Sequence, residues 1–162
     1  MLNRTKDKIV DLQRAKEIRN TWSHQGLEVV FTNGCFDIIH LGHIDYLEKA
    51  REKGSKLIVA VNSDQSVKKL KGDFRPVTDE KSRLRLIAAL SFVDLVIPFV
   101  EDTPYDLIKA LMPDILVKGN DYLAENIVGA DIVSKNGGRV ETIELVSGYS
   151  TTSIIDKIRS FK

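Results

Sequence analysis

The stretch FTNGCFDIIHLGHIDYL, residues 31–47, links the end of an apolar segment to the start of a helical pattern. It holds two of the three histidines of the chain, its only cysteine and two glycines. We expect Asn33-Gly34 to form a turn that ends a strand, and a helix to begin near Gly42 or His43. The free N–H groups and the positive dipole end of that helix predict an anion-binding corner.

Two kinds of segment alternate along the rest of the chain. Short segments rich in β-branched residues predict five strands, at residues 28–32, 56–62, 94–99, 114–119 and 139–145. Helical patterns precede, separate and follow them, at residues 10–25, 42–54, 78–93, 103–112 and 150–161. This alternation predicts an α/β fold, namely a Rossmann-like open parallel five-stranded sheet with helices on both faces.

Length and composition place the chain among ordinary globular proteins. Its 162 residues predict a single domain, with a helical extension at 1–27 and a Rossmann-like core at 28–162. A net charge of +1 argues against a nucleic-acid partner. Cys35, as the only cysteine, excludes an internal disulfide and fits a reducing compartment. No apolar run approaches the roughly 18 residues of a membrane span, so we expect a cytoplasmic protein.

A basic segment follows the second predicted strand. Residues 63–79, SDQSVKKLKGDFRPVTD, are expected to form a long loop at the carboxyl edge of the sheet, where open α/β sheets bind ligands. We interpret it as a mobile lid over a substrate, and a solvated charged loop is the alternative. Its basic residues are Lys68, Lys69, Lys71 and Arg75.

The two clustered histidines are candidates for phosphate recognition. His40 and His43 flank Leu41-Gly42, and Gly42 would let a phosphate approach the backbone without a side chain in the way. Both imidazoles could then donate hydrogen bonds to phosphate oxygens. Two alternatives stay open: histidines satisfied in the core, and a metal-binding module in which Cys35 and Asp37 join them as ligands.

The H-x-G-H signature at residues 40–43 resembles that of the nucleotidyltransferase superfamily. The longer strings TNGCFD, VNSDQSVKKLKGDFRPV, LVKGNDY and STTSII resemble the heptose-1-phosphate adenylyltransferase domain of ADP-heptose synthesis, roughly from Glu28 to the C-terminus. The resemblance implies transfer of AMP from ATP to D-glycero-D-manno-heptose 1-phosphate, with Mg²⁺ accompanying ATP and pyrophosphate released. The product, ADP-heptose, would serve lipopolysaccharide or related glycan synthesis.

The resemblance also implies roles for individual residues. The catalytic residues would be His40, His43 and Lys71. The nucleotide-binding residues would be Thr32, Asn33, Gly34, Cys35, Phe36, Gly42, Arg83, Lys118, Gly119, Asp121, Thr151, Thr152 and Ser153. The substrate-binding residues would be Asn33, Asp37 and Tyr149, and no residue is assigned as a metal ligand.

Within those sets, the family pattern suggests particular contacts. The hydroxyls of residues 151–153 would hold the β- and γ-phosphates at a helix N-terminus. Asp37 would orient the histidines or support a Mg²⁺-bound nucleotide, and Arg83 would point into the site. Lys118 and Gly119 would border the base, with Asp121 near the ribose.

The chain departs from its relatives in two respects. A kinase domain often precedes this one in the family, and none is encoded here, so we expect a stand-alone transferase supplied by a separate kinase. Cytidylyltransferase relatives approach the STT helix through an R-T-x-x-G pattern, whereas this chain has ELVSGYSTT, with no arginine. This weakens a cytidylyltransferase assignment. It also leaves unexplained which residues make part of the contacts to the phosphates.

Other functions are kept as alternatives. One is cytidylyl or adenylyl transfer to a different phosphorylated acceptor, such as glycerol 3-phosphate, phosphoethanolamine or FMN. Another is a nucleotide sensor without catalysis. From the family we expect a homodimer, with exposed Trp22 or Phe99 contributing to the interface.

Overall fold

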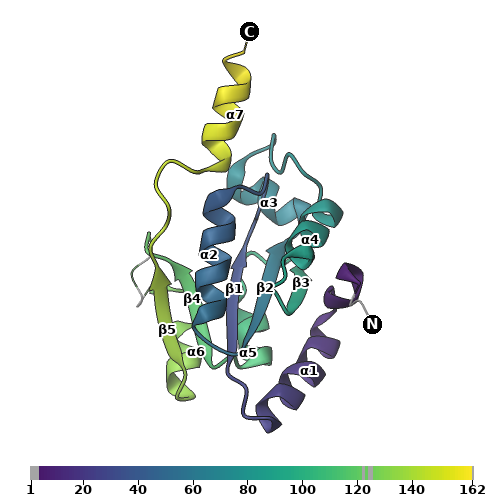
Figure 1. The fold of residues 1–162 in the computed structure, drawn as a ribbon, viewed down its shortest axis with the longest axis vertical. Coiled ribbons are helices and arrows are strands. Elements are labelled where there is room, and N and C mark those ends of the chain that lie inside the picture. Colours follow the sequence, from purple (N-terminus) through teal and green to yellow (C-terminus); the bar gives the residue numbers. More distant parts are fainter. Residues whose placement is uncertain (1–3, 122, 124–125, 162) are drawn as a thin grey trace.

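The computed structural model describes residues 4–121, 123 and 126–161. Its centre is a sheet of five strands, all pairing in parallel, in the order β3-β2-β1-β4-β5 (Figure 1). The strands are β1 (Val29–Gly34), β2 (Lys56–Asn62), β3 (Leu95–Phe99), β4 (Ile115–Gly119) and β5 (Arg139–Ile143). The predicted parallel α/β fold is therefore confirmed.

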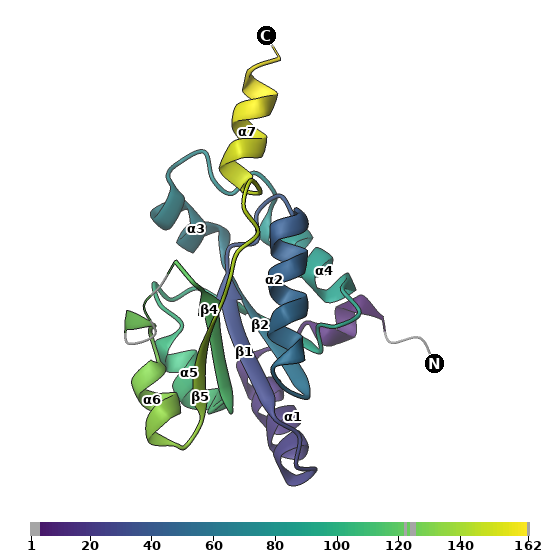
Figure 2. The ribbon, with the colours of Figure 1, turned by 60° about the vertical axis from the view of Figure 1, so that its left-hand side comes forward.

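Helices cover both faces of this sheet (Figures 1 and 2). One face packs against α2 (Leu41–Glu52) and α4 (Glu80–Ala89), and the other against α1 (Leu12–His24), α5 (Tyr105–Leu111) and α6 (Ala130–Lys135). The remaining helices are the 3₁₀ helix η1 (Thr5–Lys8), α3 (Asp64–Lys71) and α7 (Thr151–Arg159).

The central strands lie between two layers of helices, which explains why their sequences are almost wholly apolar. Val30 points to the α2/α4 side, whereas Val29 and Phe31 point to the α1/α5 side, and all three are fully buried. A strand that is covered on both faces has no solvent side, so it shows a continuous apolar run instead of alternation. Burial of these runs is the main stabilising contribution to the fold.

The strand order creates a crevice at one edge of the sheet. The chain moves from β1 to β2 and β3 on one side, and then returns to place β4 and β5 on the other side of β1. Connections therefore leave the carboxyl ends of β1 and β4 in opposite directions. Open α/β sheets bind ligands at such a switch point.

The turn predicted at Asn33-Gly34 is wrong. Both residues belong to β1, where Asn33 pairs with Ala60 and Gly34 with Val61 of β2. A Cβ on Gly34 would lie 3.0 Å from the ring of Phe36, so packing accounts for the glycine. The chain turns further on, where Phe36 and Ile38 both adopt a left-handed backbone with φ of 50°. Such strained residues persist only where the surroundings hold them.

Other boundaries also differ from the sequence predictions. The predicted loop 63–79 contains α3, which is capped by the Ser63 side chain accepting from Ser66 N–H and ends at Gly72 with φ of 98°. Helix α6 was not predicted. Phe99 is 4% exposed and Trp22 is half-buried against the α1/α5 core, so neither is the exposed anchor expected for a dimer.

The last helix lies beyond the carboxyl edge of the sheet. Figures 1 and 2 both show α7 projecting away from the body of the molecule, with its N-terminus close to the end of β1. The Thr151 hydroxyl fixes that end by donating to the carbonyl of Asp37 at 2.6 Å. Within the part of the chain that the structure describes, no helix has the length and apolar character needed to cross a bilayer.

Candidate functional site

A cavity of about 610 Å³ opens at the carboxyl ends of β1 and β4. Its walls come from the 33–37 segment, the start of α2, the end of α3, the 102–104 segment and the N-terminus of α7. The cavity therefore occupies the switch point of the sheet. It is large enough for a small ligand such as a nucleotide.

Most of the predicted site residues line this cavity. They are Asn33, Gly34, Cys35, Phe36, Asp37, His40, Gly42, His43, Lys71, Lys118, Gly119, Asp121, Tyr149, Thr151 and Thr152. Three predicted residues do not line it, namely Thr32, Arg83 and Ser153. The grouping brings together residues from both halves of the chain, as the sequence analysis expected.

The two histidines form a stacked pair. Their ring centroids are 3.8 Å apart with an interplanar angle of 22°, and Phe36 meets His43 edge-on at 5.5 Å. His40 is the N-cap residue of α2, with an extended backbone and no side-chain capping bond. The Nδ1 atoms of both rings are buried and have no hydrogen-bond partner among the described residues.

The surroundings keep both rings neutral. The pKa of His43 is lowered to about 4, mainly by burial and also by His40 and Arg75, against the opposing effect of Asp37. Burial also lowers the pKa of His40. A neutral imidazole has one N–H donor and one acceptor nitrogen. The pair can therefore offer hydrogen bonds to a ligand without carrying charge of its own.

Gly42 is favoured by the close packing around the histidine pair. A Cβ at this position would lie 3.1 Å from the His40 ring and 3.3 Å from Cβ of Tyr149. The glycine therefore lets His40 and Tyr149 approach the first turn of α2. This is a different reason for glycine from the phosphate approach that the sequence suggested.

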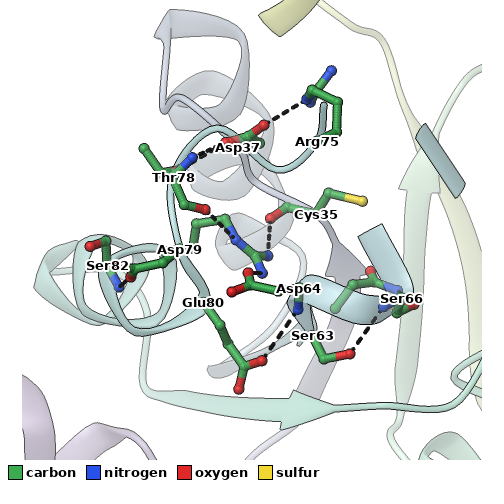
Figure 3. Close-up of polar contacts among 12 residues, drawn as sticks. Cys35, Asp37, Ser63, Asp64, Ser66, Arg75, Thr78, Asp79, Glu80 and Ser82 are labelled. Carbon is green, nitrogen blue, oxygen red and sulfur yellow. Dashed lines mark hydrogen bonds and ion pairs between the residues drawn. The ribbon is translucent and has the colours of Figure 1, made fainter. Parts of the chain in front are cut away.

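Asp37 is committed to contacts within the protein. Its side chain is buried and accepts from Arg75 Nε at 2.6 Å, Val77 N at 2.8 Å, and the N–H and hydroxyl of Thr78 at 2.9 and 2.8 Å (Figure 3). Burial alone would raise the pKa of Asp37, but these hydrogen bonds outweigh it and lower the pKa. The carboxylate thus joins the 75–78 segment to the loop of residues 35–40, called the histidine loop below. Neither oxygen is left for a metal or sugar.

Arg83 joins segments inside the protein by hydrogen bonds and does not face the cavity. It is fully buried, and its guanidinium donates to the carbonyls of Thr78 and Cys35 at 3.1 and 2.7 Å and to Asp64 Oδ1 at 2.8 Å. Figure 3 shows these three acceptors gathered between α3, α4 and the end of β1. Arg83 therefore holds the histidine loop and α3 in place from behind.

The end of β4 supplies a partly buried lysine to the cavity. Burial lowers the pKa of Lys118 to about 8, although the charges of Asp121 and Cys35 act in the opposite direction. The Lys118 ammonium donates to the carbonyl of Asn33 at 3.3 Å, which joins β4 to β1 at the cavity floor. Burial also raises the pKa of the Cys35 thiol, so a nucleophilic thiolate is disfavoured at neutral pH.

The three hydroxyls predicted at α7 divide their roles. Thr151 donates to the Asp37 carbonyl, whereas the Ser153 hydroxyl accepts from the Ser150 N–H at 3.3 Å in a capping box and donates to the Ser150 carbonyl at 2.8 Å. Thr152 lines the cavity and is exposed. The first turn of α7 therefore faces the cavity with backbone N–H groups and one available hydroxyl.

Sequence reasoning missed several residues of the cavity wall. Arg75 was noted only as part of a basic loop, and Asn62, Tyr46 and the 126–128 segment were not singled out. Tyr46 bonds through its hydroxyl to Thr32 Oγ1 at 2.7 Å, which explains why Thr32 is buried below the cavity. For Asn62, the available signal was a polar residue directly after a buried strand.

A resident metal site is not supported by the side chains that the structure describes. Over residues 4–121, 123 and 126–161, no group of three or more histidine, cysteine, aspartate or glutamate side chains could hold a metal ion. Cys35, Asp37, His40 and His43 share the cavity but do not form such a group. The metal-binding module considered from the sequence is therefore not favoured.

A parallel sheet with a cavity at its switch point, and a histidine pair opening the helix after β1, defines a Rossmann-like α/β protein with a candidate nucleotide site. The model of the cytidylyltransferase-like family matches residues 31–157, and the chain belongs to this family. The family assignment made from the H-x-G-H signature is confirmed.

Similar curated proteins include the bifunctional protein HldE of Mesorhizobium japonicum, 52% identical over 155 residues, and that of Magnetococcus marinus, 50% identical over 156 residues. Each alignment covers 96% of this chain, but only 31% and 32% of the respective relative. The chain thus spans about a third of the length of the curated relatives it matches.

Two solved structures show the same architecture. The lipopolysaccharide core biosynthesis protein from Thermoplasma volcanium has a TM-score of 0.60 and 34% identity, with 77% of this chain and 100% of that chain covered. Pantoate-beta-alanine ligase from Francisella tularensis also has a TM-score of 0.60, with 94% of this chain and 78% of that chain covered. Its identity is 16%, so this second likeness shows the fold alone.

Proposed function

We propose that the protein is a nucleotidyltransferase that moves AMP from ATP to D-glycero-D-manno-heptose 1-phosphate, releasing pyrophosphate and forming ADP-heptose. The observation that carries the proposal is the stacked, neutral pair of His40 and His43 in a nucleotide-sized cavity, whose buried Nδ1 atoms have no hydrogen-bond partner among the described residues. The strings shared with heptose adenylyltransferases support the choice of acceptor, as does the similarity to the Thermoplasma core biosynthesis protein.

The proposed reaction is a direct in-line displacement. An oxygen of the acceptor phosphate attacks the α-phosphorus of ATP, the bond from that phosphorus to the bridging oxygen breaks, and pyrophosphate leaves with the electron pair. No protein nucleophile is needed, so the protein contributes alignment and stabilisation of developing charge. His40 and His43 would donate hydrogen bonds to the α-phosphate, and Lys71 would neutralise charge from the end of α3.

ATP would enter as its Mg²⁺ complex, with the phosphates holding the ion. This fits the donor set, because the Asp37 carboxylate is saturated by protein hydrogen bonds and no acidic cluster faces the cavity within the described ranges. The base and ribose would lie toward Lys118, Gly119 and Asp121. The acceptor sugar would meet Asn33 and Tyr149, which are polar and line the cavity.

A substrate matrix tests this proposal. Purified protein is incubated with ATP or CTP and with each of four acceptors, and pyrophosphate release and product mass are measured. The acceptors are heptose 1-phosphate, glycerol 3-phosphate, phosphoethanolamine and FMN. ADP-heptose should form only when ATP and heptose 1-phosphate are both present. Faster turnover of CTP with glycerol 3-phosphate, or of ATP with FMN, would show that the proposed acceptor is wrong. Nucleotidyl transfer as the reaction class would still stand. Nucleotide binding without pyrophosphate release would favour a sensor.

We further propose that the protein acts in the cytoplasm as a homodimer. The unpaired Cys35, half-buried at the cavity, supports a reducing compartment. The dimer follows from the family resemblance. Light scattering of the purified protein across a range of concentrations would test it, and a mass of 18.2 kDa throughout would contradict it.

A further inference from the structure

The cavity has to hold a triphosphate, yet the wall expected to grip it carries no positive charge. The segment leading into α7, residues 145–153, contains no lysine or arginine. The histidine pair is neutral at pH 7. Fixed cations must therefore come from other walls, and the lysines and arginines that line the cavity in the described part of the chain are Lys71, Arg75 and Lys118.

Arg75 is the best positioned of these cations. Its Nε donates to Asp37 Oδ2 at 2.6 Å, and its side chain is 15% exposed, whereas Lys71 is an exposed residue at the end of α3. The terminal NH₂ groups of Arg75 make no hydrogen bond or ion pair with the residues that the structure describes. Asp37 therefore fixes one edge of the guanidinium and leaves its other edge for a ligand.

The same aspartate connects Arg75 to α7. The backbone carbonyl of Asp37 accepts from Thr151 Oγ1 at 2.6 Å. The carboxylate of the same residue holds Arg75 (Figure 3). Arg75 is also close enough to His43 for its charge to lower the pKa of that imidazole. Arg75 is thus linked through Asp37 to the first turn of α7 and lies near the histidine pair. Lys118 lines the same cavity from β4.

We propose that Arg75 binds the β- and γ-phosphates of the nucleotide, with Asp37 as its positioning residue. The inference rests on the proposed nucleotidyl transfer. The two terminal NH₂ groups match two phosphate oxygens in a bidentate arrangement, which a lysine cannot reproduce. Backbone N–H groups at the start of α7 would bind the same phosphates from the other side. Arg75 thereby supplies the arginine that the ELVSGYSTT approach lacks.

Binding measurements on ATP and AMP test this role. Mg²⁺–ATP and AMP are titrated by calorimetry into the wild type, Arg75→Lys, Arg75→Ala and the control Arg14→Ala, which removes an exposed arginine paired with Glu17 on α1. Loss of a charge-assisted bidentate contact should weaken ATP binding roughly 10- to 100-fold in both Arg75 variants. AMP binding should change less than about twofold, because AMP lacks the β- and γ-phosphates. Arg14→Ala should match the wild type.

Several results would overturn the inference. Unchanged ATP affinity in both Arg75 variants would exclude the contact. An equal loss of ATP and AMP affinity would point to disturbance of the 75–78 segment instead. If pyrophosphate release by the Arg75 variants shows a rise confined to the KM of the acceptor, Arg75 contacts the acceptor phosphate instead. Failure of the wild type to bind either nucleotide would overturn the proposed function itself, and so is distinguishable from these outcomes.

Discussion

His40 and His43 lie face to face at the start of α2, 3.8 Å apart between ring centroids. Two imidazolium ions could not share this position without strong repulsion, and the lowered pKa of each ring keeps the pair uncharged. A hydrogen-bond donor that is already fixed in position costs little reorganisation when charge develops in a transition state. The pair is thus suited to the α-phosphate, and the formal positive charge is left to Lys71, Arg75 and Lys118.

Removal of either ring should reduce turnover and leave the fold intact. We expect His40→Ala and His43→Ala each to lower kcat by about 10²- to 10³-fold, the usual effect of losing one donor to a developing charge. Pyrophosphate release and a melting curve are the measurements. His24→Ala, at the exposed end of α1, is the matched control. Near wild-type turnover in either cavity variant would exclude the proposed role.

The histidine pair also predicts how stability depends on pH. His43 has a pKa of about 4 when folded and about 6.5 when unfolded, so the unfolded chain binds a proton first as pH falls. The free energy of unfolding should therefore be fully retained above pH 6.5 and decline toward pH 4. Urea unfolding at several pH values measures this slope. His43→Asn, which cannot titrate, should show a shallower decline, and an identical slope would contradict the assignment.

Loss of Arg83 should lower the free energy of unfolding more than it weakens ATP binding. Replacement by leucine leaves the carbonyls of Thr78 and Cys35 without their donor, at roughly 1–3 kcal/mol for each buried acceptor left unpaired. We expect Arg83→Leu to melt earlier and Arg83→Lys to recover part of the loss. Arg85→Leu, on the exposed side of α4, is the control. A fully stable Arg83→Leu with weak ATP binding would instead support the nucleotide contact suggested by the sequence.

The fold was predictable because its signal is repeated along the chain. Each buried strand is a continuous apolar run, and each such run leaves few alternatives to a covered parallel sheet. The exceptions were local. Asn33-Gly34 has the composition of a turn, but pairing with Ala60 and Val61 extends the strand through it. For α3, the charge of residues 63–71 concealed a helix whose buried side consists mainly of Ser66 and Val67.

The members of the site were predictable, but their orientation was not. Residue type and position placed His40, His43 and Lys118 at one edge of the sheet, where the structure also has them. The sequence contains no signal that Asp37 is saturated by the 75–78 segment or that Arg83 points inward. Those contacts join residues far apart in the chain, and depend on how α3, α4 and the histidine loop pack together.

The lid predicted for residues 63–79 stays a prediction, and the structure forms the first part of this stretch as α3. Gly72 has a positive φ of 98° with open space around it, and Lys68, Lys69 and Lys71 before it are cleavage sites for trypsin, whereas the Arg75–Pro76 bond is not. If the segment closes over bound nucleotide, Mg²⁺–ATP should slow tryptic cleavage between residues 68 and 75. Lys71→Ala should remove part of this protection and weaken use of ATP. Equal cleavage rates with and without ATP would show that the segment does not close.

Gly42 offers a final test of how tightly the histidine pair is positioned. A methyl group there would lie 3.1 Å from the His40 ring and 3.3 Å from Tyr149 Cβ, so one of them must move by a few tenths of an ångström. Such displacement of a catalytic group should lower kcat roughly tenfold, since even a 1 Å misplacement can cost about a hundredfold. Leu41→Ala, on the exposed side of the same turn, is the control for helix stability. We expect Gly42→Ala to melt close to the wild type and to lose kcat at an unchanged KM for ATP. If KM for ATP rises while kcat is retained, Gly42 serves phosphate binding, as the sequence first suggested, and not the packing of His40.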